Sequence, residues 1–126
     1  MKLRIKGNSL RLRVAPSEVP RLLQTGRIEE TIHFGPHKDS SWTYALEHAA
    51  NETEISLRYQ PGEVAVVLST PTALAWANSD QVAIEGALEN GQGQLTLLVE
   101  KDFACLDQTH PDNEDTFPNP NSDRPC

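Results

Sequence analysis

The sequence predicts an α+β domain in which two consecutive β-β-α-β-β units form a curved, mainly antiparallel sheet or barrel of eight strands, with two short helices and an extended C-terminal arm. Three observations lead to this prediction. Short segments alternate apolar and polar residues with a period of two, which indicates half-buried strands. Two short apolar segments contain prolines in their first turn, as helices tolerate. Moving the sequence along itself by 54 positions places the pattern of the first half over that of the second.

The 126 residues are enough for one compact domain and too few for two independent cores. We assign residues 1–101 to the duplicated unit, with repeats at about 1–48 and 53–101. Residues 102–126 hold four of the nine prolines and five aspartates, and have few apolar residues. This composition predicts an extended arm or a tail outside the packed core.

The first two strands are predicted over residues 2–6 and 9–14, on either side of Gly7-Asn8. This dipeptide is typical of a two-residue hairpin loop because both residues tolerate positive φ. A two-residue loop determines the pairing register. The register predicted here places Arg4 opposite Arg11.

The remaining elements are predicted from the same periodicities and from turn residues such as Gly26 and Pro61-Gly62. They are a helix over 16–26, strands over 28–34 and 42–47, strands over 55–59 and 64–68, a helix over 71–78, and strands over 82–88 and 95–99. Four aromatic residues fall on the apolar phase of these elements and are expected to anchor the core: Trp42, Tyr44, Tyr59 and Trp76.

The charge of the chain is unevenly distributed. Its net charge of -7 makes nucleic acid an unlikely general partner, because binding by counterion release needs a basic surface. Residues 1–27, however, carry a local charge of +6, and the rest of the chain carries -13. No apolar run approaches the roughly 20 residues that a membrane helix needs, and the charged opening Met1-Lys2-Leu3-Arg4 does not resemble a signal peptide. We therefore expect no membrane partner and a cytoplasmic location.

The first hairpin carries the main candidate site. In the predicted register, five cations share one face of the sheet: Lys2, Arg4, Lys6, Arg11 and Arg13. Like charges opposite each other destabilise a sheet, so this face needs compensation. Three interpretations are open: a salt-bridge ladder with Glu29, Glu47, Glu85 or Glu100, a bound phosphate, nucleotide or acidic peptide, or a solvated face. In the second half only Arg58 retains a positive charge at the equivalent positions, and it is the sixth candidate ligand-binding residue.

The arm contains four potential zinc ligands: Cys105, His110, Asp112 and Cys126. No C-x-x-C or H-x-x-x-H pair is present, so we predict neither a metal site nor a cofactor. Free thiols are the usual state of such cysteines in a cytoplasmic chain, and a Cys105–Cys126 disulfide is the alternative. The sequence shows no phosphate-binding loop, dinucleotide fingerprint or G-x-S-x-G motif, and no catalytic set.

Two resemblances add to this interpretation. Tandem β-β-α-β-β units with charged strand faces resemble the triphosphate tunnel proteins, whose eight-stranded barrels hold polyphosphates with basic residues and metal-binding glutamates. That family opens with Glu-x-Glu-x-Lys where this chain has Lys-Leu-Arg-Ile-Lys at 2–6, so the metal-binding acids are replaced. Segments 4–14, 98–106 and 115–120 are similar to the opening and closing motifs of a small bacterial family known only as a domain of unknown function.

The combined expectation is a non-enzymatic bacterial domain that binds a small anion or phosphate ligand through its basic hairpin. Two alternatives remain: a metal-dependent phosphohydrolase of the triphosphate-tunnel type, and an interaction module that forms a homodimer. A monomer and a homodimer are both compatible with the sequence.

Overall fold

The structure is a computed structural model that describes residues 1–51 and 53–103. Its elements follow the order β-β-α-β-β twice, as predicted. They are β1 (Lys2–Lys6), β2 (Ser9–Val14), α1 (Glu18–Thr25), β3 (Arg27–His33), β4 (Ser41–Ala49), β5 (Ile55–Gln60), β6 (Glu63–Ser69), α2 (Thr70–Ala77), β7 (Ala83–Glu89) and β8 (Gln94–Lys101).

The eight strands form two four-stranded sheets, and not the single curved sheet or closed barrel that the sequence predicts. Sheet A has the order β1-β2-β8-β7, and sheet B has the order β3-β4-β6-β5. Each helix carries the chain from one sheet to the other, so each sheet contains one hairpin from either half. The two central pairs, β2–β8 and β4–β6, are therefore parallel, whereas the four hairpins are antiparallel.

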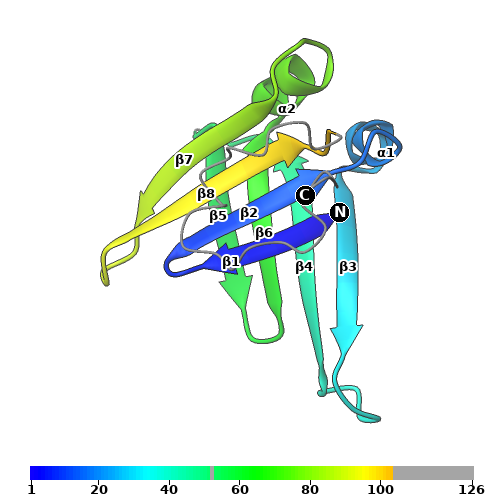
Figure 1. Cartoon of the computed structure of the whole chain (residues 1–126), viewed down its shortest axis with the longest axis vertical. Helices are drawn as coiled ribbons and strands as arrows, with labels where there is room; N and C mark the ends of the chain where they lie inside the picture. Colours follow the sequence, from blue (N-terminus) through cyan, green and yellow to red (C-terminus); the bar gives the residue numbers. More distant parts are fainter. Residues whose placement is uncertain (52, 104–126) are drawn as a thin grey trace, which may run out of the picture.

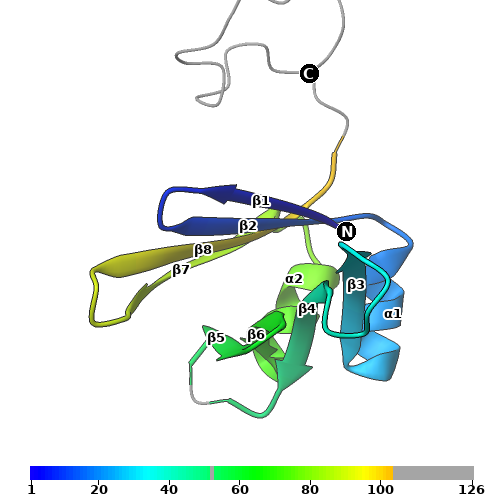
Figure 2. The ribbon, with the colours of Figure 1, turned by 90° about the horizontal axis from the view of Figure 1, so that it is seen from below.

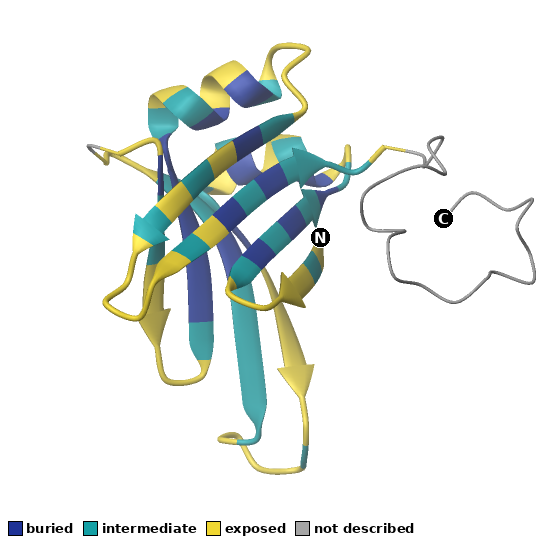
Figure 3. Cartoon of the chain, turned by 60° about the vertical axis from the view of Figure 1, so that its left-hand side comes forward, coloured by how far each residue is buried: buried dark blue, intermediate teal, exposed yellow. Residues whose placement is uncertain are grey.

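The two sheets pack face to face and enclose the core. Figure 2 shows them as separate layers, and in Figure 1 the strands of sheet A run obliquely across those of sheet B. Burial alternates strictly along β2, which confirms the predicted period of two (Figure 3). Fully buried side chains come from both sheets and both helices, and the largest are Trp76, Leu12, Leu22, Leu46, Leu68 and Leu97.

Both helices lie at the same end of the sandwich (Figure 1) and contact each other. Helix α1 ends at Gly26, whose φ of 80° and hydrogen bond to the Leu22 carbonyl confirm the predicted stop. A short loop connects helix α2 to β7. At the end of this loop, the Trp76 indole N–H donates to the Val82 carbonyl at 3.0 Å, which ties the helix to the start of β7. Neither helix of the described residues has the length and apolar character required to cross a membrane.

The aromatic residues divide into buried and exposed groups. Trp76 is fully buried as predicted, and Trp42 and Tyr44 are half-buried, with ring centroids 6.0 Å apart. Tyr59 is 71% exposed, so the prediction that it anchors the core is wrong. It lies near the end of the edge strand β5, next to the Pro61-Gly62 turn, where its strand has a neighbour on one side only.

Candidate functional site

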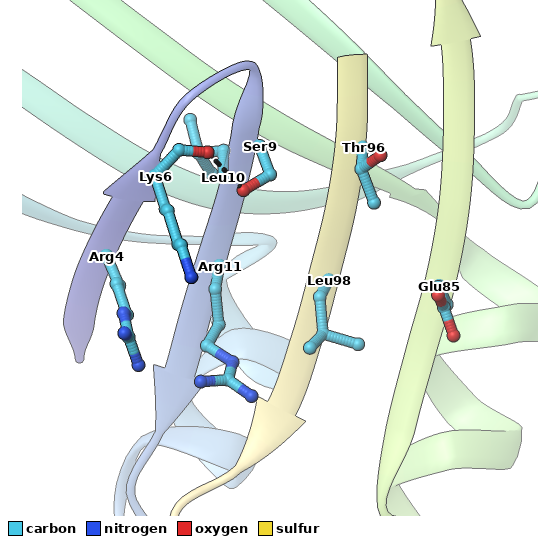
Figure 4. Close-up of a pocket in the computed structure, with 8 residues that line it drawn as sticks. All are labelled: Arg4, Lys6, Ser9, Leu10, Arg11, Glu85, Thr96 and Leu98. Atoms are coloured by element: carbon cyan, nitrogen blue, oxygen red, sulfur yellow. Dashed lines mark hydrogen bonds between the residues drawn. The ribbon is translucent and has the colours of Figure 1, made fainter. Parts of the chain in front are cut away.

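Five basic side chains share the outer face of sheet A. The β1–β2 register places Arg4 opposite Arg11 and Lys2 opposite Arg13, which confirms the predicted pairing. Arg11 and Arg13 alternate with the buried residues of β2, and Lys2, Arg4 and Lys6 lie opposite outward-facing positions of β2, so all five side chains project away from the core. Figure 4 shows Arg4, Lys6 and Arg11 on the same side of the sheet. We call these five residues, Lys2, Arg4, Lys6, Arg11 and Arg13, the basic face.

Glu100 of β8 is a carboxylate beside this face, on the strand next to β2. The parallel β2–β8 register pairs Arg13 with Glu100. Glu100 Oε1 lies 3.1 Å from Arg11 Nε and 3.0 Å from Arg13 Nε, and its side chain is 14% exposed. The contact with Arg13 lacks hydrogen-bond geometry, so it is an electrostatic one between buried atoms. Glu100 was one of four acids that the sequence suggested as counter-ions, and it holds two of the arginines in place.

Asp102 provides a second carboxylate, just beyond the end of β8. Its carboxylate is 3.0 Å from Lys2 Nζ and 3.8 Å from Arg13 Nε. Its backbone N–H donates to the Val14 carbonyl at 2.9 Å, which keeps the chain beside β2. The hydrogen bond from Lys2 lowers the pKa of Asp102, against the opposing effect of desolvation. The last described residues are therefore attached to the basic face.

A hollow of about 190 Å³ opens between the hairpin and β8. This volume is several times the roughly 30 Å³ that one water molecule occupies in the liquid. The residues around it are Arg4, Lys6, Ser9, Leu10, Arg11, Glu85, Thr96 and Leu98 (Figure 4). Three of the five residues of the basic face line one side, whereas Glu85 lies on β7 at the far side, beyond Leu98. The hollow therefore has a cationic side with space next to it.

Arg58 lies on the other sheet, separated from the five residues of the basic face. Its guanidinium donates to both carboxylate oxygens of Glu47, at 2.6 and 2.7 Å, and lies 3.4 Å from Glu63. Arg27 also pairs with Glu47, and contacts Glu29 at 2.6 Å and Glu63 at 2.7 Å. This network connects all four strands of sheet B, with three carboxylates around two guanidinium groups.

The pKa values of this network follow from these contacts. The hydrogen bond from Arg58 lowers the pKa of Glu47, and desolvation only partly opposes it. Hydrogen bonds from Arg27 and then Gln60 lower the pKa of Glu63. The hydrogen bond to Glu29 raises the pKa of Arg27. The sequence signal for the network was the hairpin register that sets Arg27 opposite Glu47, but our sequence interpretation assigned the glutamates only to the N-terminal hairpin.

The potential metal ligands Cys105, His110, Asp112 and Cys126 lie outside the described residues. Within residues 1–51 and 53–103, no group of three or more histidine, cysteine or acidic side chains is arranged to hold a metal ion.

Comparison with known proteins identifies a family. No curated protein and no solved structure matches this chain. A family model described as a family of unknown function (DUF7009) matches residues 1–121, which includes both sheets, the basic face and most of the C-terminal segment. This confirms the resemblance to an uncharacterised domain that the sequence motifs suggested. The chain belongs to this family of unknown function.

Proposed function

We propose that the basic face binds a small anion that carries phosphate groups, with no chemical step. The observation that carries the proposal is the cross-strand pair Arg4 and Arg11, next to Lys6, along one side of a hollow of about 190 Å³. Guanidinium groups form paired, charge-assisted hydrogen bonds with phosphate oxygens, and an anion between like charges offsets their repulsion.

The contacts suggest a division of roles within the basic face. Arg4, Lys6 and Arg11 line the hollow and would contact the anion. Arg13 and Lys2 lie toward Glu100 and Asp102, at the other end of the hairpin. Glu100 contacts Arg11 as well as Arg13, so it neutralises part of the Arg11 charge and would compete with the anion for this guanidinium.

A comparison of the equivalent hairpins in the two sheets supports placing the anion site on sheet A alone. We infer that the two halves arose by duplication, because exchanging them converts the strand order of one sheet into that of the other. In this equivalence Arg4 corresponds to Arg58, but Arg11 corresponds to Ala65, which lies opposite Arg58. The fold therefore does not require a second arginine at this position, and its presence on sheet A favours a ligand.

The test is isothermal titration calorimetry of the full chain with tripolyphosphate and with inorganic phosphate at low salt. We expect wild-type protein to bind tripolyphosphate. Arg4→Ala and Arg11→Ala should each weaken binding by about tenfold or more, since hydrogen bonds to charged groups contribute about 1.5–3 kcal/mol. The matched control is Arg58→Ala, which removes the same side chain from sheet B and should leave the affinity unchanged.

Two results would contradict the proposal. Wild-type affinity in Arg4→Ala and Arg11→Ala would show that the basic face is not the site, and an equal loss in Arg58→Ala would indicate attraction by general charge. Release of phosphate from tripolyphosphate with magnesium or manganese would favour the phosphohydrolase alternative.

A further inference from the structure

We propose that the acidic segment 104–126 binds the basic face of its own chain and competes there with the external anion. The proposal rests on the anion site described above and names what regulates it. The first supporting observation is the position of Asp102, next to the end of the described chain. Asp102 pairs with Lys2 at 3.0 Å and donates its N–H to Val14, so the chain enters this segment directly beside the basic face.

The charge of the segment is complementary to that of the face. It contains five carboxylates and one cation: Asp107, Asp112, Glu114, Asp115, Asp123 and Arg124. The contacts of Asp102 with Lys2 and Arg13 show that a carboxylate of this part of the chain can neutralise the face. The segment therefore carries negatively charged oxygen atoms that can accept hydrogen bonds from arginine, as the phosphate groups of the proposed anion would.

Reach and concentration both favour binding within one chain. Twenty-three residues could span up to about 75 Å, while the six residues of β2 extend over roughly 20 Å. A tether of this kind keeps the segment at an effective concentration of the order of millimolar. The family match continues to residue 121, so most of the segment lies within the extent that the family model covers.

The first experiment detects the contact by zero-length carbodiimide cross-linking of the full chain, followed by digestion and mass spectrometry. The Lys2–Asp102 ion pair is the internal positive control, because its charged atoms are 3.0 Å apart. We expect additional links from Lys6 or Lys2 to carboxylates within 107–123. Lys38, exposed in the loop between β3 and β4, is the control lysine and should form no such link.

Two cross-linking results would overturn the proposal. One is a Lys2–Asp102 link without any link from Lys2 or Lys6 to 107–123. The other is a link that joins only separate molecules, detected by mixing isotopically labelled and unlabelled chains, which would assign the segment to a second copy.

The second experiment measures competition by calorimetry with tripolyphosphate. The triple variant Asp112→Asn, Glu114→Gln, Asp115→Asn should bind tripolyphosphate about threefold to tenfold more tightly than wild type. The matched control, Asp39→Asn, Asp80→Asn, Glu89→Gln, changes the net charge equally at exposed positions elsewhere. An equal gain in both variants, or no gain in the first, would contradict competition. If no variant binds tripolyphosphate, the anion proposal fails, while cross-linking still decides whether the segment binds the face.

Discussion

Gly86 of β7 and Ile55 of β5 meet where the edges of the two sheets come together. A Cβ atom at position 86 would lie 2.3 Å from Cγ2 of Ile55, closer than real Cβ atoms approach a neighbour. Ile55 is 6% exposed and part of the core. The missing side chain at position 86 therefore allows sheets A and B to close on this side of the sandwich.

Gly86→Ala should destabilise the protein by about 1–3 kcal/mol, because the added methyl group overpacks this contact. A loss of stability would point to this steric contact, because alanine in a strand is otherwise favoured over glycine by roughly 0.5–1 kcal/mol. Urea unfolding of Gly86→Ala, Ile55→Ala and the double variant gives a double-mutant cycle. The alanine at 86 should cost much less when Ile55 is already truncated. An equal cost in both backgrounds would exclude the Ile55 contact as the cause.

The two helices differ in the hydrogen bonding of their N-cap residues. Ser69 Oγ accepts a hydrogen bond from the Thr72 N–H at 3.2 Å at the start of α2, whereas Ser17 at the start of α1 makes no side-chain cap hydrogen bond. Ser69→Ala should therefore lower the free energy of unfolding by about 1 kcal/mol. Ser17→Ala is its control and should stay within about 0.5 kcal/mol of wild type. Thermal and urea unfolding measure both, and equal losses would contradict a capping role for Ser69.

Glu47 makes stability depend on acid pH. Its pKa in the folded state lies below the ordinary value of 4.5, chiefly because Arg58 donates hydrogen bonds to it. Its contribution is therefore complete above about pH 4.5 and is lost as the pH falls through the folded-state pKa. Glu47→Gln should cost about 1–3 kcal/mol at pH 7, and its stability should fall less steeply than that of wild type below pH 4.5.

Urea midpoints between pH 7 and pH 3 measure this difference. Glu89→Gln, at an exposed position at the end of β7, is the control and should follow the wild-type profile. Parallel profiles for wild type and Glu47→Gln would show that other acids produce the pH dependence.

Glu100→Gln should have opposite effects on stability and on anion binding. It removes the charge between Arg11 and Arg13, whose Nε atoms lie 3.1 and 3.0 Å from Glu100 Oε1, and the loss of these partly exposed ion pairs should cost about 1 kcal/mol of stability. The same change makes the basic face more positive, so tripolyphosphate should bind about threefold more tightly and raise the unfolding temperature more than in wild type. Calorimetry and thermal unfolding test both effects, and weaker binding would show that Glu100 positions Arg11 more than it competes with the anion.

The hairpin registers were predictable because they depend on local chemistry. Gly7-Asn8 and the alternating residues around it define the Arg4–Arg11 pair, and the Pro61-Gly62 turn defines the Tyr59–Val64 pair. The same alternation predicted that the five cations share one face. It did not predict the exposure of Tyr59, because the position of a strand at the edge of a sheet has no signal within the strand itself.

The glutamate that pairs with the arginines of the basic face could be identified only from the long-range topology. The sequence suggested four glutamates, and only the parallel β2–β8 pairing selects Glu100, which is 87 residues from Arg13 along the chain. Arg58 illustrates the converse. Its position in the repeat is equivalent to that of Arg4, but its hairpin joins the other sheet, where Glu47 and Glu63 surround it.

Alternation, turn residues and helix stops were thus sufficient to specify eight strands, two helices and one strongly basic hairpin surface. The division of the strands between two sheets, and the parallel pairs at their centres, arose from the packing of apolar faces that lie far apart in the chain. The physical reason is the range of the interactions: a turn acts over a few residues, whereas burial of Leu12 in one core with Leu46 and Leu68 depends on the path of the whole chain.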